Sequence, residues 1–352
     1  MKMRVVAARA VRVAAPLIVT ALAACDNVDW GGATVQVVTP PPPGAGEANV
    51  PEPGTVAGLG LPTGRVLFHV VRNPDGTANI TPVAEISGDS LRTIRKPAGV
   101  APEAYEQRFR QAVMDVNTEF VLFRRGAEVG SMIVKGAAPV TACGVPTSTG
   151  QASTVAAAAA EREFLAFRRG LAPQVIGEYT PPQVEGTIQR YASLVAERLV
   201  LQNGLQRPRS WPGAQRDLQA LNLVLGGQSE MSATYLVGDN LGVGPADPEG
   251  YSVFYVASYE QRAGYTPIYT EVRDYDKTGK GAPKLVDHLN WNGTGGGEML
   301  IQVFGTRESW YEAVSRDKGS WRKVWEGARC REPAPPANRS IGAAERTGQT
   351  PR

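Results

Sequence analysis

Apolar and polar residues alternate in short runs over the first part of the chain beyond residue 64. Residues 65–72 and 79–86 are two such runs, and an Asn-Pro-Asp-Gly sequence typical of a reverse turn separates them. Residues 120–125 and 128–135 form a second pair around an Arg-Gly sequence. Both patterns predict antiparallel hairpins.

Helical periodicity appears between and after these hairpins. Residues 102–116 place apolar side chains on one face, with proline in the first turn. Residues 155–167 contain five consecutive alanines, and residues 182–201 carry an apolar stripe that ends at an Asn-Gly sequence. We therefore expect a central helical segment.

The chain after residue 217 is predicted to be almost entirely strand. The expected strands cover residues 218–225, 231–237, 251–258, 267–273, 299–304, 310–315 and 321–325. Hairpins on both sides of a helical insert favour an α+β fold with antiparallel sheets and a β-rich C-terminal half. A parallel doubly wound fold is disfavoured, because strands and helices do not alternate.

The N-terminus has the layout of an export signal. Basic residues precede an apolar run at 13–24, which is shorter than the roughly 20 residues of a membrane-spanning helix. The run ends in Leu-Ala-Ala-Cys at 22–25, which resembles the lipobox of bacterial lipoproteins. The resemblance implies a signal peptide at 1–24, cleavage after Ala24 and acylation of Cys25. An ordinary secretory signal with a chance cysteine is the alternative.

The boundaries of the folded region follow from composition. Residues 25–63 are expected to form the anchor and a Pro/Gly-rich tether, and 331–352 a polar, disordered tail. Between them lies a folded domain at 64–330, with hairpins and helices at 64–204 and a β-rich part at 205–330. Cleavage removes four of the 37 basic residues and leaves 33 against 34 acidic ones, so no nucleic-acid partner is expected.

Two cysteines remain if Cys25 carries lipid. Cys143 and Cys330 are predicted to form a disulfide in an oxidising compartment rather than to stay free. The chain's two histidines, His69 and His288, have no spacing to each other or to these cysteines that is typical of a metal site.

Two segments 68 residues apart align without a gap, at 222–231 and 290–299. Each pairs an initial Asn with a Gly-rich stretch, then Glu-Met and a predicted strand. The pattern resembles the FG-GAP or VCBS-type repeats, in which an Asp-rich loop binds Ca²⁺ ahead of a β-strand.

The resemblance implies ligand positions that this chain has largely lost. In the second copy Asn290, Asn292 and Thr294 replace the three aspartates and Glu298 follows, which leaves at most a weak Ca²⁺ loop. In the first copy only an amide oxygen remains at these positions, which predicts no site. A structural Gly-rich turn is the favoured interpretation of both loops, and no other cofactor is expected.

No residue set typical of catalysis is evident. The Gly-rich stretch at 293–297 precedes a strand, which argues against a phosphate-binding loop. Asp287 and His288 are neighbours that point to opposite faces of an extended segment, and no Gly-x-Ser-x-Gly sequence occurs. His288 is therefore expected at the surface or between strands, and no catalytic residue is assigned.

The tryptophans near the end of the chain have two interpretations. Trp310, Trp321 and Trp325 are expected to pack in the core and across strands, or to form an exposed aromatic face for a glycan or protein partner. Simple alternation places Trp321 and Trp325 on the same face.

These features together predict a non-catalytic lipoprotein of the cell envelope, held extracytoplasmically on the inner or outer membrane. Its folded domain would serve binding or structure, with an envelope protein or a glycan as partner. An extracytoplasmic hydrolase with a site that the sequence does not reveal is one alternative. A Ca²⁺-stabilised adhesion module is the other.

Overall fold

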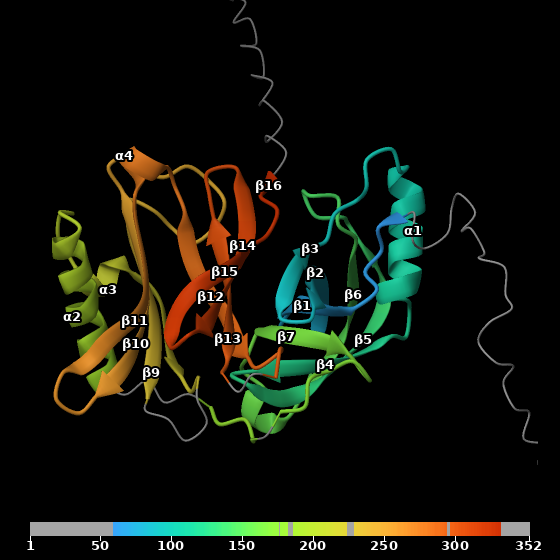
Figure 1. Cartoon of the computed structure of the whole chain (residues 1–352), viewed down its shortest axis with the longest axis horizontal. Coiled ribbons are helices and arrows are strands. Elements are labelled where there is room, and N and C mark those ends of the chain that lie inside the picture. The colour runs from blue at the N-terminus through green and yellow to red at the C-terminus, as the bar shows by residue number, and fades with distance from the viewer. Residues whose placement is uncertain (1–58, 176, 182–185, 224–228, 294–295, 332–352) are drawn as a thin grey trace, which may run out of the picture. The chain divides into compact units, whose positions relative to one another are not determined.

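β-Strands dominate the part of the chain that the structure describes. The structure is a computed structural model that describes residues 59–331 except 176, 182–185, 224–228 and 294–295 (Figure 1). Strands take up 48% of these residues and helices 15%. The expected α+β fold with a central helical segment is therefore wrong, and the fold is β-rich.

The first seven strands form one antiparallel sheet that closes into a barrel. Its order is β1-β7-β4-β5-β6-β2-β3, and β1 also pairs with β2, so six strands close the barrel and β3 extends from β2. The two predicted hairpins are confirmed as β1–β2 and β4–β5. The bounds are β1 Arg65–Arg72, β2 Thr77–Ser87, β3 Ser90–Thr93, β4 Glu119–Arg124, β5 Ala127–Ala138, β6 Thr147–Thr154 and β7 Glu163–Arg168.

One helix packs against the core of the barrel. The helix α1 (Pro102–Val113) confirms the periodicity predicted there, and its buried side chains are Tyr105, Phe109 and Val113. These side chains join the cluster that fills the barrel interior, which includes Phe68 and Phe120 with their rings in edge-to-face contact. Leu61, which the sequence assigned to the tether, is buried in the same cluster.

The alanine-rich segment at 155–167 is not a helix. Only Ala156–Ala158 form a single 3₁₀ turn, and strand β7 begins soon afterwards. Phe164 and Ala166 pack into the barrel interior, whereas Leu165 and Phe167 pack into a second cluster outside it. In a strand, successive side chains point to opposite faces, so Phe164 to Phe167 can all be buried when both faces of β7 are covered.

The rest of the chain forms a four-stranded and a five-stranded antiparallel sheet. In both sheets, strands that follow each other in the sequence are neighbours, apart from the short last strand. The predicted strands after residue 217 are confirmed, except that the strand predicted at 218–225 ends at Leu221 and that residues 224 and 225 lie outside the described residues. β12, which the sequence analysis missed, completes the second sheet. The first sheet consists of β8 Gln215–Leu221, β9 Glu230–Val237, β10 Tyr251–Glu260 and β11 Gly264–Asp274. The second consists of β12 Ala282–Leu289, β13 Glu298–Phe304, β14 Glu308–Asp317 and β15 Ser320–Glu326, and β16 Cys330–Arg331 pairs with β14.

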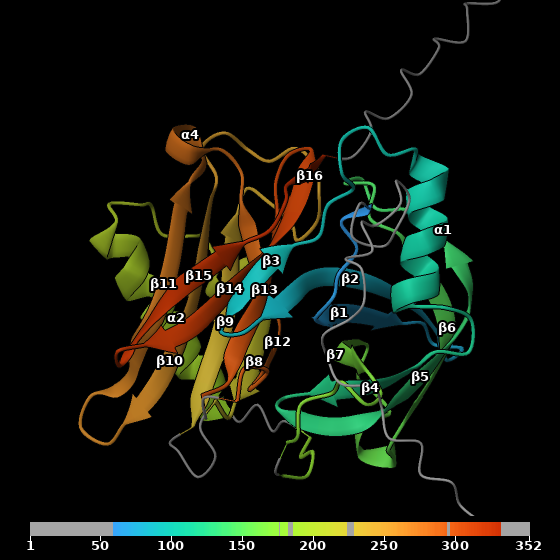
Figure 2. The same cartoon turned by 45° about the vertical axis from the view of Figure 1, so that its right-hand side comes forward.

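The two sheets pack face to face, and each has a further partner on its outer face. Apolar residues from both sheets, among them Phe254 and Ile301, form the cluster between them. The helix α2 (Gly186–Gln202), which confirms the helix predicted at 182–201, covers the outer face of the first sheet. Residues of the barrel, including Leu67 and Phe123, cover the outer face of the second. Figures 1 and 2 show this succession of α2, two sheets and barrel.

Two short helices and the chain ends complete the description. The short helices are α3 (Trp211–Ala214) and α4 (Tyr275–Thr278). Among the described residues no helix combines the length and apolar character that crossing a bilayer requires. Arg331, assigned above to the tail, lies in β16, and Cys25 and residues 332–352 lie outside the described residues.

Candidate functional site

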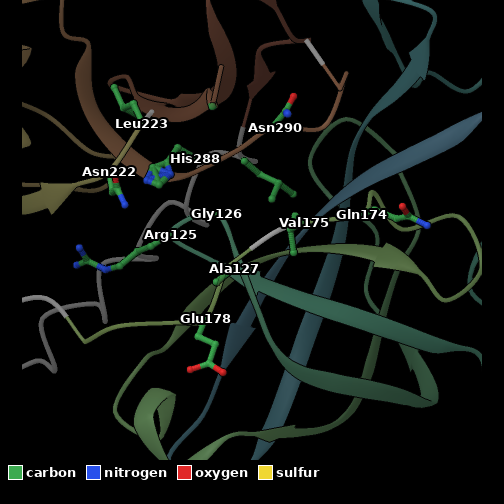
Figure 3. Close-up of a pocket in the computed structure, with 13 residues that line it drawn as sticks. Arg125, Gly126, Ala127, Gln174, Val175, Glu178, Asn222, Leu223, His288 and Asn290 are labelled. Atoms are coloured by element: carbon green, nitrogen blue, oxygen red, sulfur yellow. The ribbon is translucent and has the colours of Figure 1, made fainter. Parts of the chain in front are cut away.

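A pocket of about 290 Å³ lies where the barrel meets the two sheets. Its lining comes from the β4–β5 turn, the loop after β7, the segment that follows β8, the end of β12 and the segment between β12 and β13 (Figure 3). The segments after β8 and β12 begin the two loops that align in the sequence. Asn222 and Asn290 occupy equivalent positions in these loops, and both line the pocket.

His288 is the most deeply buried polar side chain of this lining. It is 1% exposed, and neither ring nitrogen has a hydrogen-bond partner. Its carbonyl oxygen accepts a hydrogen bond of 3.1 Å from the backbone N–H of Gly126. Figure 3 shows the ring between Asn222 and Gly126. Of the two expected positions, at the surface or between strands, the surface position is wrong: His288 lies in β12, where it pairs with Met299 of β13, and both faces of β12 are covered.

The glycine beside this ring sits in the left-handed backbone region. Gly126 has a φ of 74° in the β4–β5 turn, and a Cβ atom there would lie 3.6 Å from Cε1 of His288. A glycine suits this turn because other residues adopt that conformation at a cost. The absence of a side chain also leaves open space in front of the imidazole.

Burial controls the charge of His288. Desolvation lowers its pKa to about 4, an effect that the nearby carboxylate of Asp287 opposes and that Arg124 and Arg125 reinforce. The imidazole is therefore neutral at neutral pH and carries one N–H donor and one lone pair.

Asp287, the preceding residue, has a different role on the opposite side of β12. Its Oδ1 accepts hydrogen bonds from the backbone N–H groups of Arg125 at 2.9 Å and of His288 at 2.8 Å. Nη1 of Arg124 lies 3.5 Å from its Oδ2. The prediction that Asp287 and His288 point to opposite faces is confirmed, and this carboxylate is occupied in joining the barrel to β12.

Arg124 is the centre of that junction. Its Nε donates to Glu161 at 2.8 Å and its Nη1 to the carbonyl oxygen of Val286 at 2.7 Å. Burial opposes the charge, but the carboxylates of Asp287 and Glu161 outweigh it and raise the pKa of Arg124. The guanidinium is thus a buried, fully charged link between β4 and β12.

The glutamates of the two aligned segments close their loops in the same way. Oε2 of Glu298 accepts the backbone N–H of Trp291 at 2.9 Å, and Oε2 of Glu230 accepts that of Leu223 at 3.3 Å. Each bond spans seven residues. Burial raises the pKa of Glu230 to about 7. This geometry gives the glutamate that the two segments share a structural role, which is to close the loop before each strand.

The predicted Ca²⁺ loop is only partly within the described residues. Asn290 lines the pocket and Glu298 closes the loop, whereas Thr294 lies outside the described residues. Asn292 lies between Asn290 and the undescribed pair 294–295. In the described part of the chain, no three His, Cys, Asp or Glu side chains are grouped so that they could hold a metal ion.

The three candidate tryptophans do not form one exposed face. Trp310 is buried between the two sheets that follow the barrel, and its Nε1 donates to Glu312 at 2.8 Å. Trp321 packs against the same cluster, but Trp325 packs against the cluster on the other face of the second sheet. The prediction from alternation is wrong because β15 contains a bulge: Ala313 pairs with Trp325 and Val314 with Lys323, which leaves one extra residue.

The predicted disulfide is present. Cys143, in the loop between β5 and β6, is bonded to Cys330 in β16, 187 positions later in the sequence. The bond joins the barrel to the edge of the second sheet.

The two buried histidines make stability sensitive to acid. Desolvation lowers the pKa of His69 to about 4 as well, although Nδ1 of His69 is hydrogen-bonded to the Tyr311 hydroxyl at 3.0 Å. Because unfolded histidine titrates near 6.5, the unfolded chain binds protons more tightly between pH 6.5 and 4. Each histidine should therefore lower the free energy of unfolding by up to about 3 kcal/mol as the pH falls through this range.

Urea unfolding of wild type and His288→Leu at pH 7.5 and pH 4.5 measures this effect. Glu230 titrates in the opposite sense but is common to both proteins, so its contribution cancels in the comparison. We expect the variant to lose about 2 kcal/mol less than wild type between the two pH values. Equal losses in both proteins would show that His288 is not held neutral by the fold.

Comparison with known proteins does not extend this description. No protein-family model, curated protein or solved structure matches the chain. The function is therefore inferred from the chemistry and geometry of the site.

Proposed function

We propose that this chain is a lipid-anchored protein of the bacterial cell envelope whose folded region binds a ligand rather than catalysing a reaction. The disulfide is the observation that carries the proposal. The sequence contains three cysteines, and the bond between Cys143 and Cys330 leaves Cys25 as the third. That cysteine is the one in the lipobox-like sequence.

The presence of a disulfide supports a location outside the cytosol, where a lipid anchor would hold the protein. Disulfides persist in oxidising surroundings outside the cytosol, which agrees with export of the folded region. A single acyl chain holds a protein on a membrane only weakly, whereas several chains anchor it stably. Acylation of both the thiol and the new N-terminus of Cys25 would provide that stable anchor.

The pocket supports binding over hydrolysis. None of its described lining residues carries a hydroxyl or thiol, and Glu178 is the one that carries a carboxylate. A hydrolase that uses His288 as a base needs a nucleophile or a positioned water-activating pair nearby. Asp287 does not serve as that partner, because its carboxylate bonds to backbone N–H groups and to Arg124.

Replacing Cys25 tests the anchor directly. In cells fed an alkyne-tagged palmitate, we expect wild type to carry the tag and to sediment with membranes. Cys25→Ser should lose the tag and fail to be processed to the lipidated form. Cys330→Ser is the matched control, since it removes a cysteine without touching the lipobox, and it should still be tagged. A tag that persists in Cys25→Ser would overturn the proposal.

A further inference from the structure

Unpartnered hydrogen-bonding groups are concentrated in the pocket at His288. In the described part of the chain, 11 buried side-chain nitrogen and oxygen atoms lack a partner, and four of them belong to residues of this lining. They are Nδ1 and Nε2 of His288, Oδ1 of Asn290 and Nε of Arg125. Since most buried polar groups in folded proteins are hydrogen-bonded, such a concentration points to a ligand that completes them.

The unpartnered atoms at the centre of the pocket define which groups a ligand must offer. The neutral imidazole contributes one donor and one acceptor, and the Asn290 Oδ1 contributes a further acceptor. The Arg125 Nε–H belongs to a guanidinium that is directed away from His288 (Figure 3). The pocket therefore calls for a ligand with both N–H or O–H donors and oxygen acceptors.

The charged groups beside the pocket are either bonded to other residues or directed away from His288. Nη1 of Arg125 donates to the carbonyl oxygen of Ala220, and the Asp287 carboxylate accepts the backbone N–H of the same arginine. Figure 3 shows the charged ends of Arg125 and Glu178 directed away from His288. The centre of the pocket thus presents uncharged groups and suits an uncharged ligand.

The apolar part of the lining limits the ligand further. Ala127, Leu223 and Leu289 are buried residues that line the pocket, and Val175 is partly exposed beside them. The exposed carboxamides of Gln174 and Asn222 also belong to the lining. A volume of about 290 Å³ is at the small end of known ligand sites and fits a molecule the size of one sugar ring.

We propose that this pocket binds an acetamido sugar, an N-acetylated hexosamine, with its acetamido group beside His288. The amide N–H and carbonyl match the paired donors and acceptors, and the methyl group matches the aliphatic wall. The outer carboxamides suit the ring hydroxyls. This inference rests on the proposed function, since it names the ligand of the binding domain.

Calorimetric titration of the full chain in detergent tests the ligand class. The probes are N-acetylglucosamine, glucose, which lacks the acetamido group, and glucosamine, which replaces it with an ammonium. We expect N-acetylglucosamine to bind at least about 10-fold more tightly than either relative, which corresponds to about 1.4 kcal/mol. No binding of N-acetylglucosamine, or equal binding of glucose, would overturn the proposal.

Two histidine variants test the place of binding. His288→Leu should weaken N-acetylglucosamine binding at least about 10-fold. His69→Leu is the matched control, because His69 is the other buried neutral histidine and does not line the pocket, and it should bind as wild type does. If His288→Leu does not fold, Asn290→Ala should show the loss instead. Unchanged binding in the folded pocket variant would overturn the site.

The disaccharide N,N′-diacetylchitobiose distinguishes a glycan chain from a free sugar as the ligand. It also distinguishes failure of the proposed function from failure of the sugar site. Tighter binding than the monosaccharide identifies the end of a glycan chain as the ligand, and equal binding identifies the free sugar. Cleavage of the disaccharide would contradict the proposed function while the sugar site remained. An unlipidated Cys25 would contradict the anchor alone, and absence of sugar binding would contradict this inference alone.

Discussion

Arg124→Leu should lower the free energy of unfolding by about 3–5 kcal/mol. The Arg124 side chain is 8% exposed, and it links β4 of the barrel to β12 through Asp287 and the carbonyl oxygen of Val286. Its removal leaves the Asp287 carboxylate and much of Glu161 buried without their counter-charge. Breaking a buried pair from one side is costly for this reason, even where the intact pair contributes little.

Urea unfolding of Arg124→Leu and of Arg169→Leu provides the comparison. Arg169 forms a 2.7 Å ion pair with Glu119, but its side chain is 52% exposed. Exposed pairs of this kind contribute little to stability, so Arg169→Leu should leave the unfolding midpoint nearly unchanged. Similar losses in the two variants would contradict the role assigned to the buried guanidinium.

Removal of the disulfide should have the second large effect. In Cys143→Ser/Cys330→Ser we expect the free energy of unfolding to fall by about 2–5 kcal/mol. The two cysteines are 187 positions apart, and closing so long a loop restricts the unfolded chain strongly in the chain-entropy model.

A reductant supplies the control for this prediction. Wild type unfolded in the presence of dithiothreitol should match the double variant, because both lack the cross-link. The double variant itself should be insensitive to the reductant. If wild type were equally stable with and without dithiothreitol, the bond would not stabilise the fold.

Local patterns predicted the elements whose signals lie within a few residues of each other. The hairpins β1–β2 and β4–β5 and the helices α1 and α2 follow from turn residues and apolar periodicity. The helix predicted at 155–167 is wrong although alanine favours a helix locally. Phe164 to Phe167 are instead buried on alternate faces, by the barrel interior and by the second sheet. Tertiary packing overrode helix propensity there.

Strand β12 and the pocket could not be predicted for a related reason. The strand carries the polar residues Lys284, Asp287 and His288, which interrupt the apolar pattern used to predict strands. The charges of the first two have distant partners: Lys284 lies 2.6 Å from Glu163, and Asp287 pairs with Arg124. Spacing in the sequence does not reveal such partners. The repeated Asn at 222 and 290 was the one available signal, and both residues line the pocket.

The intact mass of the mature chain is the most direct test of the central claim, an exported and lipid-anchored binding domain. We expect a chain that begins at Cys25, carries a diacylglyceryl thioether and an N-linked acyl chain, and lacks the two hydrogens lost in forming the Cys143–Cys330 bond. A mass that corresponds to all 352 residues without lipid, or to a chain with free Cys143 and Cys330 thiols, would contradict it.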